Sequence, residues 1–359
     1  MRAVAAILLT AGCVHGNPSH ADAGGDAVDA AIDAPGLFDP GTYRETCDGS
    51  GAVALDPMHF LDVNDENQGL RIYTRATDGP PLQTFDLSAG LGVTSTDEVD
   101  LEDLARVGDR VFAIASHGRD SNGDLQPTRY RFAAFDLTGL GALPNLSFGV
   151  VGSTSTLLVD LLDSANWDTP DVNVITTLDT SSKLSDAHTP SLAPELAGTN
   201  IEGLAFAPIA GEPDRMVIGF RNPQPGGSAI VISLVNASAA VTGSKAHFGG
   251  AAQLDLGGLG IRGMAYSAEH TAVLILAGPH DSGGPFRIYK WSGELAVAPT
   301  LVGDVVPPAN SGAEAIVPYP GSKDVQILFD QGDAVIGATT CKNASPAARV
   351  FRDVIVHVE

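Results

Sequence analysis

The sequence predicts an all-β protein, a β-propeller of about six blades, with five or seven blades as alternatives. A three-part unit recurs along the chain: a short strand with an acidic residue near its start, a very apolar strand that ends in polar residues, and a closing strand. The clearest copy covers residues 201–206, 215–223 and 229–234. Successive copies lie roughly 40 to 60 residues apart, and propeller blades repeat every ~40–50 residues.

The short apolar runs are bounded by Gly, Pro, Asn and Asp, which favours strands over helices. One gap of about 100 residues, between the copies at Glu102 and Glu202, leaves room for a degenerate blade. Within the gap, residues 159–163 are expected to open a short helix and residues 172–178 to form a strand. A closed ring buries both faces of each sheet and protects the strand edges. The alternating tail, residues 350–358, is expected to complete a blade begun at the N-terminus.

The N-terminus has the layout of a bacterial secretory signal over residues 1–13, with a basic start, a short apolar core and small residues at the cut. Cys13 follows Ala-Gly, and this ending resembles a lipobox, in which the Cys carries the lipid of a mature lipoprotein; an ordinary cleaved signal is the alternative. Residues 14–36 have no Lys, Arg, Phe, Trp or Tyr, so we expect a flexible tether over residues 14–46. The propeller then spans residues 47–359. The tether resembles those of lipoproteins from bacteria with large secretomes. By that resemblance, Val14 rather than Asp after Cys13 favours anchoring in the outer membrane over retention in the inner membrane.

Two cysteines remain, Cys47 before the first blade and Cys341 after the last apolar strand. The two ends of a ring meet, so a disulfide between them would close it in an oxidising compartment. Such a long loop would destabilise the unfolded state by roughly 4–5 kcal/mol. Two unrelated thiols are the alternative.

The formal net charge of −23 argues against nucleic acid and against docking on anionic lipid. The charge has two interpretations, the solubility of an exported domain or affinity for divalent cations and cationic ligands. We expect a monomer whose only membrane contact is the lipid anchor.

Aligning the repeats brings polar residues to one mouth of the ring, where propellers commonly bind ligands. One set opens the inner strands, and a second set follows the apolar strands. These candidate ligand-binding residues are Glu102, Glu202, Arg262 and Glu314 in the first set, and His117, Arg119, Arg221 and Asp330 in the second. The alternative is structural, with each Glu pairing an Arg or backbone amides to hold neighbouring blades together.

A calcium site is the candidate cofactor site. Asp120, Asn122 and Asp124 supply oxygen ligands at alternate positions, although no bidentate Glu follows at the distance of an EF-hand. A solvated hairpin is the alternative. The sequence contains no Gly-x-Ser-x-Gly nucleophile motif and no Cys pair with zinc spacing.

Several motifs resemble a family of bacterial propellers called domain of unknown function 3616. They include residues 115–119, 201–205 and 255–262, and the resemblance spans roughly residues 55–340. The family implies the propeller fold and no established activity. The Glu-Gly-Leu-Ala element at residues 202–205 is also similar to one in phytase-like and esterase-like propellers, but this chain lacks the dense acidic set of calcium-dependent phytases.

Three functions therefore stay open. The leading hypothesis is an exported propeller that binds a small ligand or a protein partner at its mouth. The second is a metal-assisted hydrolase of esters or phosphoesters, using calcium. The third is a structural scaffold of the cell envelope.

Overall fold

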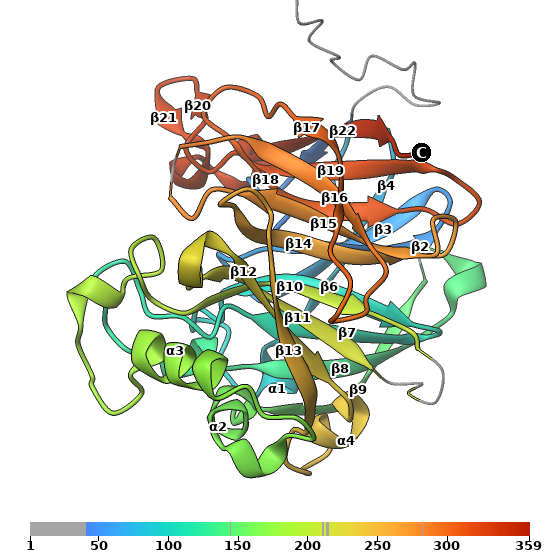
Figure 1. Ribbon diagram of the computed structural model, residues 1–359. Coiled ribbons are helices and arrows are strands. Elements are labelled where there is room, and N and C mark those ends of the chain that lie inside the picture. The colour runs from blue at the N-terminus through green and yellow to red at the C-terminus, as the bar shows by residue number, and fades with distance from the viewer. Residues whose placement is uncertain (1–40, 144, 210–211, 213–214, 282) are drawn as a thin grey trace, which may run out of the picture. The chain divides into compact units, whose positions relative to one another are not determined.

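The computed structural model describes residues 41–359, except 144, 210–211, 213–214 and 282. The predicted signal with Cys13, and the predicted tether up to residue 40, lie outside the described residues. The described part forms five four-stranded antiparallel sheets arranged as the blades of a β-propeller, with one further two-stranded hairpin (Figure 1). The predicted fold class is confirmed, with five blades in place of six.

Each blade has four strands, ordered from the centre of the ring outward. Blade 1 has β2 (Gly51–Asp56), β3 (His59–Val63), β4 (Gly69–Thr74) and β5 (Gln83–Asp86). Blade 2 has β6 (Leu101–Val107), β7 (Arg110–Ala115), β8 (Phe132–Thr138) and β9 (Ser147–Thr154). Blade 3 has β10 (Asn200–Phe206), β11 (Met216–Asn222), β12 (Ala229–Leu234) and β13 (Phe248–Leu254). Blade 4 has β14 (Gly260–Ser267), β15 (Ala272–Gly278), β16 (Phe286–Trp291) and β17 (Thr300–Val305). Blade 5 has β18 (Gly312–Pro318), β19 (Asp324–Asp330), β22 (Val350–His357) and β1 (Thr42–Arg44).

The inner strands contact one another in the order β2, β6, β10, β14, β18 and back to β2, which closes the ring. A separate cluster of buried apolar residues fills each of the five interfaces between blades. In β15, Val273, Ile275 and Ala277 face blade 3, whereas Leu274 and Leu276 face blade 5. Burial on both faces explains why the second strands are continuous apolar runs rather than alternating ones.

The long gap holds a helical insertion instead of a sixth blade. It contains α2 (Leu157–Leu162) and α3 (Val172–Ser182). The predicted short helix is confirmed, but the strand predicted over residues 172–178 is wrong. The Asp171 carboxylate accepts hydrogen bonds from the amides of Asn173 and Val174 and so caps α3. Burial of Val174 and Leu178, one helical turn apart, then outweighs the strand preference of the β-branched residues.

The insertion packs between blades 2 and 3 and enlarges the core there. Trp167 lies against Phe248 of β13 with a ring separation of 5.2 Å, and its indole N–H donates to the Leu161 carbonyl at 2.8 Å. The same cluster contains Phe112 of blade 2 and Ile218 of blade 3. The stretch of chain expected to form a blade thus forms helices that pack against blades 2 and 3.

The ring closes where the two ends of the described chain meet. The N-terminal β1 pairs with the C-terminal β22, as expected for a blade shared between the termini. This pairing also shows that the folded part begins before the predicted boundary at residue 47. Behind it, the buried Asp353 carboxylate accepts hydrogen bonds from the Gly41 amide at 2.6 Å and the Tyr43 hydroxyl at 2.8 Å.

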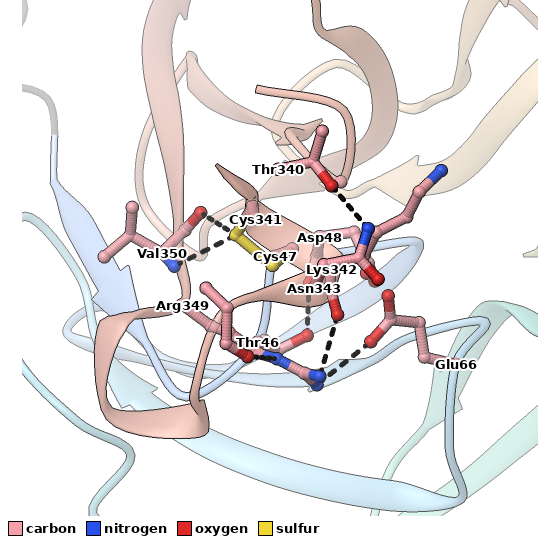
Figure 2. Close-up of a disulfide and its surroundings, with 12 residues drawn as sticks. Thr46, Cys47, Asp48, Glu66, Thr340, Cys341, Lys342, Asn343, Arg349 and Val350 are labelled. Carbon is pink, nitrogen blue, oxygen red and sulfur yellow. Dashed lines mark hydrogen bonds and ion pairs between the residues drawn. A yellow bond between two sulfur atoms is a disulfide. The ribbon is translucent and has the colours of Figure 1, made fainter. Parts of the chain in front are cut away.

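The predicted disulfide between Cys47 and Cys341 is confirmed and joins the β1–β2 connection to the loop between β19 and β22 (Figure 2). Arg349 fastens the same loop through the Glu66 carboxylate at 3.1 Å and the Lys342 carbonyl at 2.9 Å. The loop also carries the hairpin of β20 (Val335–Ile336) and β21 (Thr339–Thr340).

The remaining helices are the short α1 (Ser88–Leu91) and α4 (Ala237–Val241). Within the described part of the chain, no helix is long and apolar enough to cross a membrane.

Candidate functional site: the acidic mouth of the ring

Four of the five inner strands carry a β-bulge at the same place, two residues into the repeat motif. The strand register skips one residue there, and the skipped residues are Glu102, Glu202, Arg262 and Glu314. A bulge re-aims the side chain of its extra residue, and bulges are frequent beside functional sites. In β2 the register shift falls further along, at Leu55, so blade 1 contributes no such residue. The recurrent polar position predicted from the sequence is therefore a recurrent bulge.

Arg262 is the centre of this group. Its Nη1 lies 3.0 Å from Glu202 of the preceding blade, and its Nη2 pairs with Glu314 of the following blade. Arg221, at the end of β11, binds Glu202 at 2.7 Å and the His280 carbonyl at 2.8 Å. The arginines therefore join blades 3, 4 and 5 around one end of the ring.

Glu102 differs from the other bulged residues, since no hydrogen bond or ion pair joins its carboxylate to a described residue. Burial and the neighbouring carboxylates of Glu202, Asp100 and Glu314 raise its pKa well above the ordinary value. The pKa of Glu314 is also raised by burial, although Arg262 opposes that shift. Glu102 is thus an unpaired carboxyl group surrounded by other carboxyl groups.

More carboxylates surround Glu102 than the repeat alignment indicated. Burial raises the pKa of Asp100 to about 6 even though Arg129 binds it at 2.8 Å. Burial and nearby carboxylates also raise the pKa values of Asp48 and Asp65. The side chain of Asp65 stays partly open to solvent, and the charges of Asp100 and Asp330 add to the effect of burial on its pKa. We call this end of the ring the acidic mouth and define it by Asp48, Asp65, Asp100, Glu102, Glu202, Arg262, Glu314 and Asp330.

The floor of the acidic mouth is Asp103, the residue after the first bulge. Its Oδ2 accepts hydrogen bonds from the amides of Leu204 at 2.7 Å and Met264 at 3.2 Å, and its Oδ1 accepts one from Leu104 at 2.8 Å. The side chain is buried, and burial raises its pKa although these amides oppose the shift. One carboxyl group thus ties the inner strands of blades 2, 3 and 4 at the axis.

Close packing between neighbouring inner strands explains the small residues near this level in the other blades. Gly203 and Gly263 follow their bulges, and a Cβ on Gly263 would lie 2.5 Å from the Glu314 carbonyl. A Cβ on Gly51 of blade 1 would lie 2.4 Å from the Asp103 Cα. The axis of a five-bladed ring is narrow, so it admits one functional side chain at this level. Sequence reasoning missed Asp103, although its signal was present as an Asp where other copies have Gly or Ala.

The structure brings six of the eight candidate residues together: Glu102, Glu202, Arg221, Arg262, Glu314 and Asp330. The other two bind elsewhere. The His117 ring is fully buried, its Nδ1 lies 2.8 Å from the Ala115 carbonyl, and burial lowers its pKa to about 4. The Arg119 guanidinium holds backbone carbonyls of the helical insertion, among them Ser182 at 3.0 Å and Asp186 at 2.8 Å.

The oxygen atoms of the candidate calcium turn bind within the turn and to a neighbouring loop. Asp120 accepts hydrogen bonds from the amides of Asn122 and Asp124, both at 2.9 Å. The Asp124 carboxylate pairs with His188 at 2.7 Å. Among the described residues, no group of three or more His, Cys, Asp or Glu side chains is arranged to hold a metal ion.

Comparison with solved structures finds distant similarity. The glutaminyl cyclase of Myxococcus xanthus is 12% identical, with 89% of this chain and 98% of that chain covered and a TM-score of 0.41. A putative oxidoreductase (glucose dehydrogenase) of Thermus thermophilus is 12% identical, with 88% and 100% covered and a TM-score of 0.42. Likenesses at this level carry no inference about activity.

Comparison with curated protein sequences found no match. A family model does match: residues 168–311 fit a family described as a protein of unknown function, DUF3616. The matched segment covers the end of the helical insertion, blade 3 and blade 4, and so includes Glu202, Arg221 and Arg262. The resemblance that the sequence motifs indicated is thereby confirmed over residues 168–311 of a β-propeller.

Proposed function

We propose that this protein is an exported, lipid-anchored β-propeller that binds a small cationic ligand, an organic amine, in its acidic mouth. The observation that carries the proposal is the unpaired Glu102 carboxyl, held among other carboxyls with a raised pKa. Export is supported by the disulfide, because such bonds persist in oxidising compartments.

The charges of the mouth favour a cation. Arg262 is already shared between Glu202 and Glu314, and Arg129 is held by Asp100 and Glu98. Neither guanidinium is left to neutralise Glu102 directly. A ligand cation near Glu102 would relieve repulsion between carboxylates, and it would lower their pKa values by favouring the charged forms.

Part of the mouth is structural. The ion pairs of Glu202, Arg262 and Glu314 link three blades, as the scaffold hypothesis expects. Removing one partner of such a buried pair leaves an uncompensated charge, which is strongly destabilising. Glu102 is therefore the residue to change when ligand binding is tested, because its loss breaks no hydrogen bond to a described residue.

The test is the shift of melting temperature of the purified protein in calcium chloride, magnesium chloride and 1,4-diaminobutane, each at constant ionic strength. We expect 1,4-diaminobutane to raise the melting temperature of the wild type and to have no effect on Glu102→Gln. The control is Glu294→Gln, which removes an exposed carboxylate in the connection after β16. Equal shifts in all three proteins, or no shift in any, would contradict the proposal.

A further inference from the structure

The other end of the ring holds a cavity whose lining is mostly apolar, in contrast to the carboxylates of the acidic mouth. The second halves of all five inner strands, with the connections that follow them, surround a volume of about 430 Å³. Its lining is formed mainly by residues 52–55, 104–106, 204–206, 265–269 and 318–320, which we call the apolar funnel. The size is within the ~300–1,000 Å³ range of small-molecule sites.

The walls of the apolar funnel are aliphatic and aromatic. Phe206 and Tyr266 meet edge to face with ring centroids 6.1 Å apart, and Tyr319 contributes from blade 5. The lining starts at Leu104 and Leu204, whose amides bind the Asp103 carboxyl. Asp103 therefore lies next to the inner end of the funnel, on the side of the acidic mouth.

One cation, Arg106, lines the apolar funnel. Its Nε donates to the Gly108 carbonyl at 2.7 Å, and its Nη1 donates to the carbonyls of Ala54 and Leu55, both at 2.8 Å. Within the described part of the chain, Nη2 has no hydrogen-bond partner and the guanidinium forms no ion pair. Burial lowers the pKa of Arg106, although Asp109 and Asp56 oppose the shift. The charge is thus partly desolvated without a direct counterion.

The carboxylates near this end are bound to other groups. Asp56 accepts hydrogen bonds from the Met58 amide at 2.7 Å and from the His59 amide at 2.9 Å, and it contacts the His59 ring. Glu269, on the blade 4 side, accepts one from the Gly321 amide at 3.0 Å. A ligand anion would therefore sit on the Arg106 side and away from Glu269.

We propose that the apolar funnel binds a small amphipathic carboxylate, with its apolar chain directed toward Asp103 and its carboxylate on Arg106. The charge complementarity of Arg106 selects an anion, because a guanidinium and a carboxylate form strong charge-assisted hydrogen bonds. The apolar walls select a hydrocarbon chain, because burying such a surface is favourable. This site is independent of the cation site proposed above.

The test compares three ten-carbon probes of equal chain length: decanoate, decanol and decylamine. Binding to the full chain is measured by calorimetry below the concentration at which each probe forms micelles. We expect decanoate to bind about tenfold more tightly than decanol and decylamine. Arg106→Gln should lose this preference, while its affinity for decanol stays within about twofold of the wild type.

A second variant, Ala54→Phe, tests the site without removing Arg106, in case Arg106→Gln lowers the stability of the protein. Ala54 lines the funnel and is partly exposed in it, so a larger side chain there occupies the cavity and leaves Arg106 in place. We expect it to reduce the binding of decanoate and decanol alike, by about tenfold or more. Failure of decanoate to bind the wild type, preference for decylamine, or unchanged binding in Ala54→Phe would overturn the proposal.

Discussion

The two ends of the central channel are built from the same five strands, yet one end is acidic and the other is apolar. At the acidic mouth, bulges turn Glu102, Glu202, Arg262 and Glu314 toward the axis. At the apolar funnel, the four bulged strands continue in regular register, β2 has its own register shift at Leu55, and the strands present mainly Ala, Leu and aromatic residues. One backbone irregularity repeated in four blades therefore contributes half of the residues that define the acidic mouth, and the strand connections and the end of β19 supply the rest.

Asp103 lies between the two ends. Asp103 binds amides of blades 2, 3 and 4 and occupies the axis where other blades have Gly or Ala. Its carboxyl accepts hydrogen bonds from amides of three inner strands at the level where the acidic mouth gives way to the apolar funnel. The comparison therefore depends on Asp103, and its removal is the most direct way to break it.

We expect Asp103→Ala to have the largest effect. It would leave three amides without an acceptor near the axis, and each buried unpaired amide costs about 1–3 kcal/mol. The free energy of unfolding, measured by denaturant titration, should fall by about 3–5 kcal/mol.

The matched control for this substitution is Asp103→Asn, which retains the shape and one acceptor oxygen and should lose less stability than Asp103→Ala. A loss of under about 1 kcal/mol in Asp103→Ala would show that the amides find other partners and that Asp103 does not organise the axis.

The prediction of the fold from sequence succeeded where the pattern was local and repeated. Apolar runs bounded by turn residues mark each blade, and the two cysteines at the ends of the ring indicated the disulfide. The leading blade count of six was one too high, although five was among the alternatives. The β-branched residues of the segment 172–178 had favoured a strand there. Capping by Asp171 and packing against blades 2 and 3 make this segment a helix, and tertiary packing cannot be read from propensity.

The acidic mouth was also partly predictable from the repeat. Polar residues at one phase of the repeat indicated the acidic mouth, because a recurring position in a ring has a recurring location. His117 and Arg119 follow their strand in the same way, but their side chains turn into the protein. His117 binds the Ala115 carbonyl of its own blade, and Arg119 binds the helical insertion. The apolar funnel had no signal, since Ala and Leu at the end of a strand are common in any core.

The disulfide offers the second prediction, because it lies on the side of the acidic mouth. Cys47 precedes Asp48, and its carbonyl accepts a hydrogen bond from the Gln331 amide, which follows Asp330, at 2.8 Å. Replacing both Cys47 and Cys341 by Ser should lower the free energy of unfolding by about 2–5 kcal/mol.

The double Ser variant should also separate the two ends. We expect a smaller melting shift with the amine at the acidic mouth and unchanged binding of decanoate in the apolar funnel, measured at a temperature where the variant is folded. As a control, a reducing agent should destabilise the wild type and leave the variant unaffected. Equal weakening at both ends would show that the disulfide supports the whole ring rather than the mouth.

The smallest expected effect is on the pH dependence of the melting temperature. It distinguishes the two ends because the groups with raised pKa values lie in the acidic mouth. The folded protein raises the pKa values of Asp100, to about 6, and of Glu102 and Glu314. Between the ordinary carboxyl pKa and these raised values, the folded state binds more protons than the unfolded state, so stability falls as pH rises. The melting temperature should therefore increase by a few degrees, about 2–5 °C, when the pH is lowered from 8 to 5.5.

Two variants assign this slope to one end of the channel. Glu102→Gln removes a mouth carboxyl of raised pKa, so its melting temperature should depend less on pH than that of the wild type. Arg106→Gln removes a funnel charge that does not titrate in this range, so its slope should match the wild type even if its stability is lower. Burial of His117 works in the opposite direction, because its lowered pKa makes stability rise with pH between about 4 and 6.5. A melting temperature that rises with pH between 6.5 and 8, above that range, would contradict the raised carboxyl pKa values. A slope that Arg106→Gln changes and Glu102→Gln does not would place the titrating groups at the apolar funnel and reverse the assignment of the two ends.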